Sequence, residues 1–486
     1  MSLESGSFLP PPGDSRPLAV VAAVQKTGTT DEELNSSLEE LERLGTTLGL
    51  EIIGRVTQRR HKLVSGVVFG EGKLRELASW TGGPGEVAAF EKPGKQKKVL
   101  DDDEEEDAYY DDDEDALDPQ AAAEAAADPS FVPPQRKATV VLVDHDLGPT
   151  QQSNLEKATG VDVLDRTAVI VEIFHRHAKT REARLQVEIA RLKYLAPRLR
   201  ESGGGGDRVR GGVGGKGAGE SSMELDKRRI RDRIAELRHE LAQIEGSSKT
   251  RRGRRGELPT VALVGYTNAG KSSLMRQLTT TEVLVADKLF ATLDTTVRRL
   301  QPPTEPPILV TDTVGFIKKL PHDLVASFRS TLDEAGDADL LLHVVDAADA
   351  ALADQLAVTR EVLKEIGADK VPTWLVLNKI DRVDELGRRS LEERYPGALQ
   401  LSAKSAADIH TLRNHLIEKF AGKLEEDELD VPWAAQRIVH AIHERAEVLG
   451  EEHHDDGTRL KVRAPARILE ELRAQLAEHV AAPAPV

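Results

Sequence analysis

Nine residues in the middle of the chain have the types and spacing that a phosphate-binding loop requires. Glycines in such a loop let successive backbone N–H groups bond phosphate oxygens, a lysine reaches the β- and γ-phosphates, and a serine hydroxyl ligates Mg²⁺. The loop follows an apolar run at 260–264 that predicts a strand, and it leads into a predicted helix, which is the context this motif needs. Taken alone, the pattern also fits a glycine-rich turn followed by a chance lysine and serine. The predicted phosphate-binding residues are Gly265, Tyr266, Thr267, Asn268, Ala269, Gly270, Lys271, Ser272 and Ser273.

A second motif has residues that could contact the γ-phosphate and a bound Mg²⁺. The apolar run at 308–311 predicts a strand that ends in Asp312 and, three residues later, Gly315, which places a carboxylate near the metal and a glycine N–H near the γ-phosphate. Residues 290–296 lie where a mobile switch loop belongs, and three threonines there compete to ligate Mg²⁺, with Ser272 as the other protein ligand. The predicted switch residues are Phe290, Ala291, Thr292, Leu293, Asp294, Asp312, Thr313, Val314 and Gly315.

Two further loops would select the base. A predicted strand at 374–377 ends in Asn-Lys-Ile-Asp, and the carboxylate of Asp381 can accept two hydrogen bonds from N1 and N2 of guanine. Adenine lacks this donor pair, so the sequence favours GTP over ATP. The backbone of the loop 401–404 would face the guanine O6. The predicted guanine-binding residues are Asn378, Lys379, Ile380, Asp381, Ser402, Ala403 and Lys404. Together the motifs predict a Mg²⁺-dependent GTP hydrolase that binds GTP and GDP.

Phe316 occupies the position after the second motif where many signalling GTPases carry the glutamine that orients the attacking water. A phenyl ring cannot orient water by hydrogen bonding. One interpretation is therefore slow intrinsic hydrolysis that needs a partner to order the site. The other is a hydrophobic residue that packs beneath the switch.

Composition narrows the class of protein. The chain has 486 residues, enough for about three domains, and no cysteine, which excludes disulfides and thiolate chemistry. The longest apolar run, at 18–24, is far shorter than a membrane span, and the N-terminus lacks a basic signal region. We therefore expect a cytoplasmic protein with no membrane partner.

Charge is distributed unevenly along the chain. The net charge is −17, but twelve acidic residues and no basic residue lie between Asp101 and Asp115, within a low-complexity insertion. Residues 176–216 instead hold eleven Lys or Arg against four Asp or Glu, and basic residues recur to Arg255. This segment could neutralise phosphates of RNA, or its charges could belong to solvated helix faces.

The elements before the loop alternate between strand and helix periods. Strands are predicted at 18–24, 51–56, 139–144 and 161–164, and helices at 31–48, 72–80, 151–159 and 168–175. This alternation predicts a parallel sheet. Two amphipathic helices follow, with apolar positions at 185–195 and 230–244, and ten glycines lie between them. They predict an antiparallel hairpin whose glycine-rich loop either fits against a phosphate backbone or is a solvated linker.

The tail is predicted to hold a helix at 434–449, a turn at 453–457, a strand at 458–462 and a helix at 466–479. We interpret the His453-His454-Asp455-Asp456 sequence as a solvated turn rather than a metal site.

The expected fold class is α/β: an N-terminal parallel α/β domain with a long helical hairpin, a P-loop GTPase domain and a small α/β C-terminal domain. The expected boundaries are a disordered leader at 1–17, the N-terminal domain at 18–175 with a disordered insertion at about 92–136, the hairpin at 176–256, the GTPase domain at 257–420 and the C-terminal domain at 421–486.

Nearly the whole chain, apart from the leader and the insertion, resembles the HflX GTPases. The segments that carry the resemblance are Val56–Arg60, Asn154–Ala158, Val163–Thr167, Thr180–Glu182, Leu185–Glu188, Leu192–Leu195, Phe290–Asp294, Asp312–Ile317 and Leu320–His322. The resemblance implies a monomeric, ribosome-associated GTPase that binds the large ribosomal subunit and its rRNA and splits stalled or idle ribosomes, with hydrolysis stimulated by the ribosome. It also implies that Thr292 ligates Mg²⁺.

The chain departs from the family pattern at two places. Residues 216–224 replace the usual Arg-Gly-Pro-Gly-Glu-Thr-Gln-Leu-Glu sequence, and Thr295 stands where proline is usual, which leaves the contacts of both loops open. Two other functions share these motifs: a ribosome-assembly or RNA-modification GTPase, and a nucleotide-dependent RNA remodeller with an additional ATP site in the hairpin.

Overall fold

The computed structural model describes residues 16–61, 66, 68–86, 134–199, 222–255, 258–279, 289–290, 296–304, 307–318, 334–421 and 424–481. Most of the predicted leader, the acidic insertion, the glycine-rich loop and residues 291–295 lie outside this part of the chain. The chain divides into two compact units, residues 1–175 with 194–214 and residues 176–193 with 215–486.

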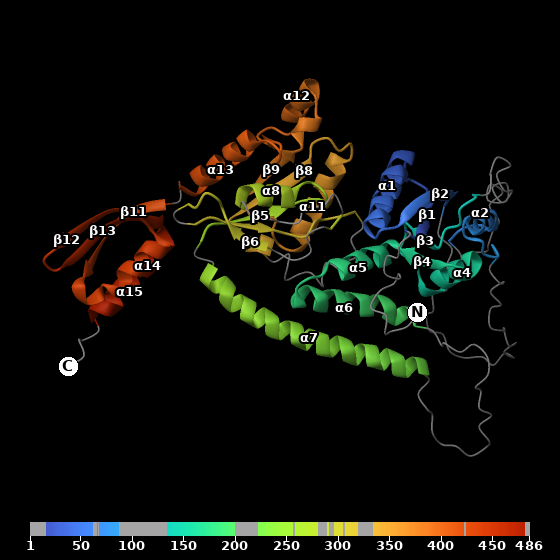
Figure 1. The fold of residues 1–486 in the computed structure, drawn as a ribbon, viewed down its shortest axis with the longest axis horizontal. Helices are drawn as coiled ribbons and strands as arrows, with labels where there is room; N and C mark the ends of the chain where they lie inside the picture. The colour runs from blue at the N-terminus through green and yellow to red at the C-terminus, as the bar shows by residue number, and fades with distance from the viewer. Residues whose placement is uncertain are drawn as a thin grey trace, which may run out of the picture. The chain divides into compact units, whose positions relative to one another are not determined.

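A parallel sheet with the strand order β2-β1-β3-β4 forms the first unit. Its strands alternate along the chain with helices (Figure 1), because a connection between parallel strands must cross over the sheet. The predicted parallel α/β arrangement is confirmed. The elements are β1 (Leu18–Lys26), α1 (Asp31–Thr47), β2 (Glu51–Arg60), α2 (Glu71–Thr81), β3 (Val140–Val143), α4 (Pro149–Thr159), β4 (Asp162–Asp165) and α5 (Arg166–His177).

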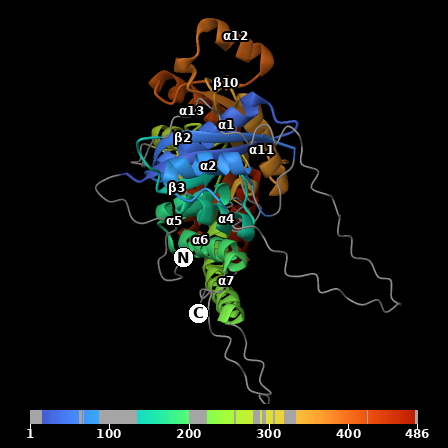
Figure 2. The same ribbon diagram turned by 90° about the vertical axis from the view of Figure 1, so that its right-hand side faces the viewer.

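Helix α1 begins where its sequence predicts. The Thr30 hydroxyl accepts the Glu33 N–H at 3.2 Å, and the Glu33 carboxylate accepts the Thr30 N–H at 2.8 Å, so two free donors at the helix start are satisfied. Leu38, Leu41 and Leu44 lie on its buried face. Helices α1 and α2 lie on opposite sides of the sheet (Figure 2).

A buried polar cluster at the end of β4 fastens the elements of the first unit to one another. Asp165 is fully buried and accepts hydrogen bonds from the N–H groups of Leu147 and Ala168 at 3.1 and 2.8 Å. It also accepts the Tyr194 hydroxyl and the Arg198 guanidinium, both at 3.0 Å. A buried carboxylate needs such partners to remain stable. Asp165 and Tyr194, which lie in two of the segments that carry the family resemblance, therefore have a structural role.

The predicted antiparallel helical hairpin is confirmed by α6 (Arg181–Leu195) and α7 (Ser222–Arg255). Arg181 pairs with Glu240 at 2.9 Å, and Glu188 pairs with Arg233 at 3.2 Å. Residue numbers increase along α6 where they decrease along α7, so the two helices are antiparallel. Helix α7 has 34 residues, about 50 Å at 1.5 Å per residue.

A six-stranded sheet lies at the centre of the region predicted to be the GTPase domain, in the order β10-β9-β8-β5-β7-β6. All of its neighbouring pairs are parallel except β6 with β7. The carboxyl ends of the parallel strands therefore meet at one edge, where ligands bind in open α/β sheets. The strands are β5 (Thr260–Val264), β6 (Thr296–Arg299), β7 (Leu309–Asp312), β8 (Leu340–Asp346), β9 (Thr373–Asn378) and β10 (Leu399–Gln400).

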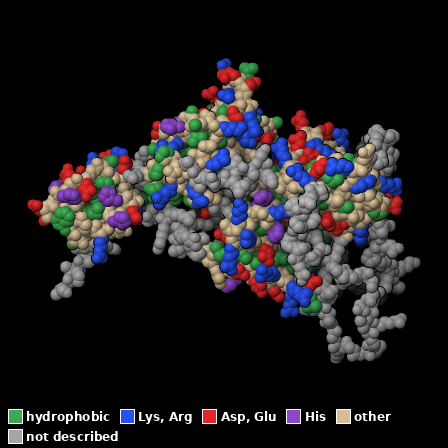
Figure 3. Space-filling model, in the orientation of Figure 1, with side chains coloured by type: hydrophobic (Ala, Val, Ile, Leu, Met, Phe, Trp, Pro, Cys, Tyr) green, Lys and Arg blue, Asp and Glu red, His purple; other side chains and the backbone are tan. Residues whose placement is uncertain are grey.

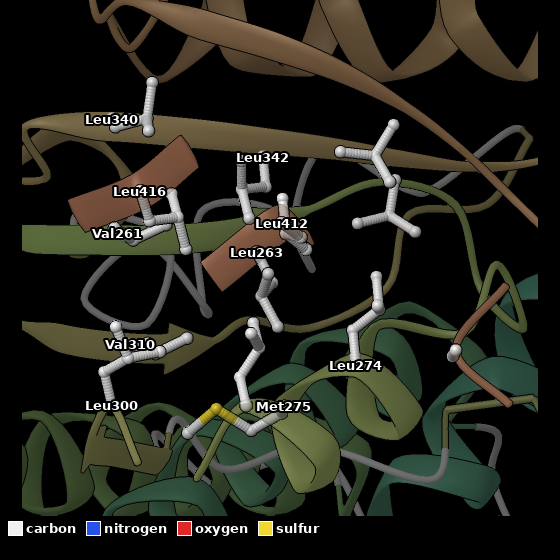
Figure 4. Close-up of a cluster of buried hydrophobic side chains, with 14 of the residues drawn as sticks. Val261, Leu263, Leu274, Met275, Leu300, Val310, Leu340, Leu342, Leu412 and Leu416 are labelled. Atoms are coloured by element: carbon white, nitrogen blue, oxygen red, sulfur yellow. The ribbon is translucent and has the colours of Figure 1, made fainter. Parts of the chain in front are cut away.

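Helices cover both faces of this sheet. On one face, Leu274 and Met275 of α8 (Lys271–Thr279) and Leu412 and Leu416 of α13 (Ala406–Ala421) pack with Leu263 of β5 and its neighbours (Figure 4). On the other face, α11 (Leu352–Glu365) packs through its buried leucine and valine side chains. The two layers hold the loops at the carboxyl edge in place.

The tail forms a three-stranded antiparallel sheet in the order β11-β13-β12, packed against two helices. The elements are β11 (Leu424–Pro432), α14 (Arg437–Arg445), β12 (Glu447–His454), β13 (Gly457–Pro465) and α15 (Ala466–Ala481). No helix in the described ranges combines the length and apolar character needed to span a membrane.

One prediction for the tail is wrong, and two of its strands, β11 and β12, were not predicted. The helix predicted at 434–449 ends at Arg445, because Val448 enters β12 and pairs with Val462 of β13. Strand β11 was not predicted, since its sequence is mostly acidic. Its Leu429 and Val431 are buried, while its outer carboxylates pair with basic residues of β13, as Asp430 does with Arg459 at 2.7 Å.

Candidate functional site

The loop after β5 has the geometry of a phosphate cradle. Lys271 is buried, and its Nζ donates to the carbonyl oxygens of Gly265 at 2.9 Å and Tyr266 at 2.8 Å, so the ammonium group is held across the loop. Gly270 has φ +98°, and a Cβ there would overlap the Asn378 side chain. Only glycine fits this position. Helix α8 starts at Lys271, so its N-terminal N–H groups lie at the end of this loop, where a phosphate would bind.

Burial lowers the pKa of Lys271 to about 8, and the Asp312 carboxylate only partly opposes this effect. The pKa in the folded protein lies below the ordinary 10.5, so the unfolded chain binds more protons between these values. The stability of the nucleotide-free protein should therefore rise with pH across this window. A bound phosphate favours the charged lysine and should raise its pKa again.

We therefore predict that nucleotide binding takes up about half a proton at pH 8, where the free lysine is about half protonated. Calorimetric titration with GDP in two buffers of different ionisation enthalpy measures this uptake directly. At pH 7 the lysine is already mostly charged, so the uptake should nearly vanish. Equal observed enthalpies in both buffers at pH 8 would contradict the prediction.

Hard oxygen donors suited to Mg²⁺ meet beside this loop. The Ser272 hydroxyl donates to the Asp312 carboxylate at 2.8 Å, and Asp312 ends β7 with 1% exposure. Mg²⁺ prefers oxygen ligands and commonly takes one or two from protein, with waters and phosphate completing its shell. These two side chains fit that requirement. Thr313 is used differently, because its hydroxyl donates to Leu263 O at 2.8 Å and fastens β7 to β5.

The first switch loop lies mostly outside the described residues, including Ala291, Thr292, Leu293 and Asp294. Phe290, at its start, is buried with φ +56°. In the second switch, Phe316 is 1% exposed and packs with Val264 and Leu341. The Phe316 ring is therefore packed among hydrophobic residues and has no group to orient water, which is compatible with both interpretations of this residue.

The residues predicted to select the base contact the predicted phosphate loop. The Asn378 amide donates to Ala269 O at 2.8 Å and accepts the Ala403 N–H at 3.0 Å. Lys379 Nζ donates to Asn268 O at 2.7 Å. The phosphate loop and the base loops thus form one connected site at the carboxyl edge of the sheet.

Asp381 is held in a defined orientation. Its Oδ1 accepts the Ser402 hydroxyl at 2.6 Å, and Lys404 Nζ lies 3.7 Å from its Oδ2. The hydrogen bond from Ser402 is the main cause that lowers the pKa of Asp381, so the carboxylate stays ionised at neutral pH. An ionised carboxylate is the acceptor that the N1 and N2 donors of guanine require.

The sequence analysis missed two residues that support this site. Asp346 ends β8 and accepts Lys379 Nζ at 2.7 Å, and Asp408 accepts the Ser402 N–H at 2.7 Å. The signal for Asp346 was a carboxylate at the end of an apolar strand. Nothing in the local sequence indicates that Asp408, two residues into α13, reaches back to the preceding loop.

Models of three protein families match the chain. A "50S ribosome-binding GTPase" family matches residues 260–379, a "GTP-binding GTPase Middle Region" matches 177–255, and a "GTP-binding GTPase N-terminal" family matches 35–87 and 130–175.

Relatives that match most of the chain agree with these family matches. The chain is 53% identical to the GTPase HflX of Gluconacetobacter diazotrophicus over 95% of this chain and 98% of that protein. It is 35% identical to the GTPase HflX of Caldanaerobacter subterraneus over 94% and 92% of the two chains, and 42% identical to that of Escherichia coli over 68% and 78%. The chain therefore belongs to the HflX family of GTPases and is a GTP-hydrolysing enzyme.

Proposed function

We propose that this GTPase binds the large ribosomal subunit and its rRNA, splits stalled or idle ribosomes, and hydrolyses GTP faster when the ribosome is bound. The description of the matching family, a 50S ribosome-binding GTPase, supports the partner. The observation that carries the dependence on a partner is the buried Phe316, because no hydrogen-bonding side chain stands at the position where a catalytic glutamine would orient water.

We propose the following roles for the residues of this site. Residues 265–273 bind the phosphates, Ser272 and Thr292 ligate Mg²⁺, and Asp312 to Gly315 with residues 290–294 respond to the γ-phosphate. Asn378 to Asp381 and Ser402 to Lys404 bind guanine. The metal would neutralise charge that develops on the phosphates during transfer, while Lys271 and the loop N–H groups orient them.

Helix α7 offers charges suited to RNA. Lys227, Arg231 and Arg238 are exposed on it, whereas Arg233 is paired with Glu188. Acidic and basic side chains are mixed over the face of the protein visible in Figure 3. The attraction to RNA phosphates would therefore come from local groups of basic residues such as those on α7. We propose that α7 and the neighbouring glycine-rich loop meet ribosomal RNA.

We propose that the chain divides into an N-terminal domain at 18–175, a hairpin at 176–256, a GTPase domain at 257–420 and a C-terminal domain at 421–486. The family matches, at 35–87 with 130–175, at 177–255 and at 260–379, support the first three of these domains. We propose that the protein acts as a monomer in the cytoplasm and is partly ribosome-associated.

We expect purified large subunits to accelerate GTP hydrolysis at least tenfold, which corresponds to about 1.4 kcal/mol of barrier. The measurement is single-turnover hydrolysis with large subunits, small subunits, intact ribosomes and precursor particles. Splitting is measured in sucrose gradients of intact ribosomes with GTP, GDP or a non-hydrolysable analogue.

Hydrolysis rates that stay the same with every particle would contradict ribosome stimulation. Acceleration by precursor particles but not by mature subunits would instead support a ribosome-assembly GTPase.

A further inference from the structure

The segment after Gly315 is joined side by side to the phosphate loop. Tyr266 and Phe316 form a parallel β-bridge. The Phe316 N–H donates to Gly265 O at 3.1 Å, and the Thr267 N–H donates to Phe316 O at 2.8 Å. Two backbone hydrogen bonds therefore align the second switch with the loop that would hold the phosphates.

A third hydrogen bond continues this ladder through a side chain. The Tyr266 hydroxyl accepts the backbone N–H of Lys318 at 2.7 Å, and Tyr266 is only 5% exposed. The side chain of Lys318 is held as well, because its Nζ pairs with Asp354 of α11 at 2.9 Å. That ion pair is partly exposed and contributes little. The partly buried hydrogen bond from Lys318 N–H to the Tyr266 hydroxyl is the stronger constraint on the Lys318 backbone.

The ladder fixes Gly315, the residue whose N–H would meet the γ-phosphate. A Cβ added to Gly315 would lie 2.9 Å from Thr267 Cα and 3.0 Å from Lys271 Nζ, so the glycine backbone is in close contact with the loop and with the phosphate-binding lysine. Any shift of residues 316–318 moves Gly315 relative to Lys271. The position of the γ-phosphate donor thus depends on the contacts that hold the next three residues.

We propose that Tyr266 is a positioning residue that makes the site favour GTP over GDP. Its hydroxyl holds residues 316–318 against the phosphate loop and so presents the Gly315 N–H before the γ-phosphate arrives. GDP lacks this phosphate and gains nothing from the arrangement, so the hydroxyl affects GTP affinity alone. This inference rests on the proposed phosphate-binding role of residues 265–273.

The test compares Tyr266→Phe with the full-length parent protein. This change removes one oxygen and keeps the ring that fills the buried space. The affinities for GDP and for a β,γ-imido analogue of GTP are measured with Mg²⁺ by competition against a fluorescent guanine nucleotide. We expect analogue affinity to fall about three- to tenfold in the variant, as for one lost hydrogen bond, with GDP affinity changed less than twofold.

Tyr395→Phe is the matched control. Tyr395 lies at the end of α12 (Glu385–Arg394) in the same domain, where its ring faces the Arg394 guanidinium and packs against the hydrophobic cluster that includes Leu377 and Ile380. Removal of its hydroxyl should leave both affinities unchanged. Hydrogen exchange of the backbone at 316–318 gives a second readout and should be faster in Tyr266→Phe than in the control.

Equal weakening of both nucleotides by Tyr266→Phe would overturn the proposal, since it would mean that the hydroxyl only maintains the loop. Unchanged analogue affinity or unchanged exchange would overturn it as well. Failure of the parent protein to bind GDP would instead refute the proposed phosphate site itself.

Discussion

Replacement of Asp381 with asparagine is expected to lower the affinity for guanine nucleotides about 100- to 1,000-fold, while the affinity for xanthosine nucleotides rises. The carboxylate can accept both N1–H and N2–H of guanine, whereas an asparagine amide presents an N–H group to the N2 donor. Xanthine carries an oxygen at this position and can accept that N–H. Ser402 holds the carboxylate at 2.6 Å and can equally hold the amide oxygen, so the loop should keep its shape.

Competition titration of GDP, XDP and ADP against a fluorescent nucleotide measures the change. Asp384→Asn is a close control, because Asp384 lies three residues away and caps α12 by accepting the Gly387 N–H at 2.8 Å. Asparagine serves as well at this cap, so base preference and stability should stay the same. Retained guanine preference in Asp381→Asn would show that another group reads the base.

Replacement of Lys271 with alanine is expected to weaken binding of GDP and GTP at least about 100-fold and to abolish measurable hydrolysis. The lysine would contribute two charge-assisted hydrogen bonds to the β- and γ-phosphates, each worth about 1.5–3 kcal/mol. The substitution also removes the contacts of Nζ with Gly265 O and Tyr266 O, which hold the loop in shape. Both effects act in the same direction.

Lys364→Ala provides the comparison, because Lys364 is an exposed lysine near the end of α11 in the same domain. It should leave nucleotide affinity unchanged. Thermal unfolding without nucleotide separates lost binding from lost folding, since Lys271→Ala should remain folded after a buried, desolvated charge has been removed. Near-normal GTP hydrolysis by Lys271→Ala would refute the assignment of the phosphate loop.

The sequence by itself was enough to identify most of the residues that we propose for the nucleotide site. A phosphate loop needs glycine, lysine and serine at fixed spacing within one short segment, so Gly270, Lys271 and Ser272 were identifiable without the fold. Strand–helix alternation similarly determined the parallel sheet, because each period is a local property of the chain. The Thr30 cap of α1 was local in the same way.

Contacts between distant segments required the tertiary structure. Asp346 supports Lys379 across 33 positions, and the Tyr266 hydroxyl meets the Lys318 N–H across 52 positions. Neither residue has a neighbour in sequence that indicates its partner. Such pairs exist because parallel strands bring their carboxyl ends to one edge, and strand order is decided by packing of the whole sheet.

The tail shows the same division between local and tertiary control. The segment 446–449 has a helical pattern, yet Val448 pairs with Val462 because the sheet buries Val462 against α14 and α15 and packs the partly buried Val448 beside it. The acidic strand β11 forms beside basic residues of β13, which compensate its repulsion. Local propensity is worth only tenths of a kcal/mol per residue, so burial and pairing with a distant strand decided the structure here.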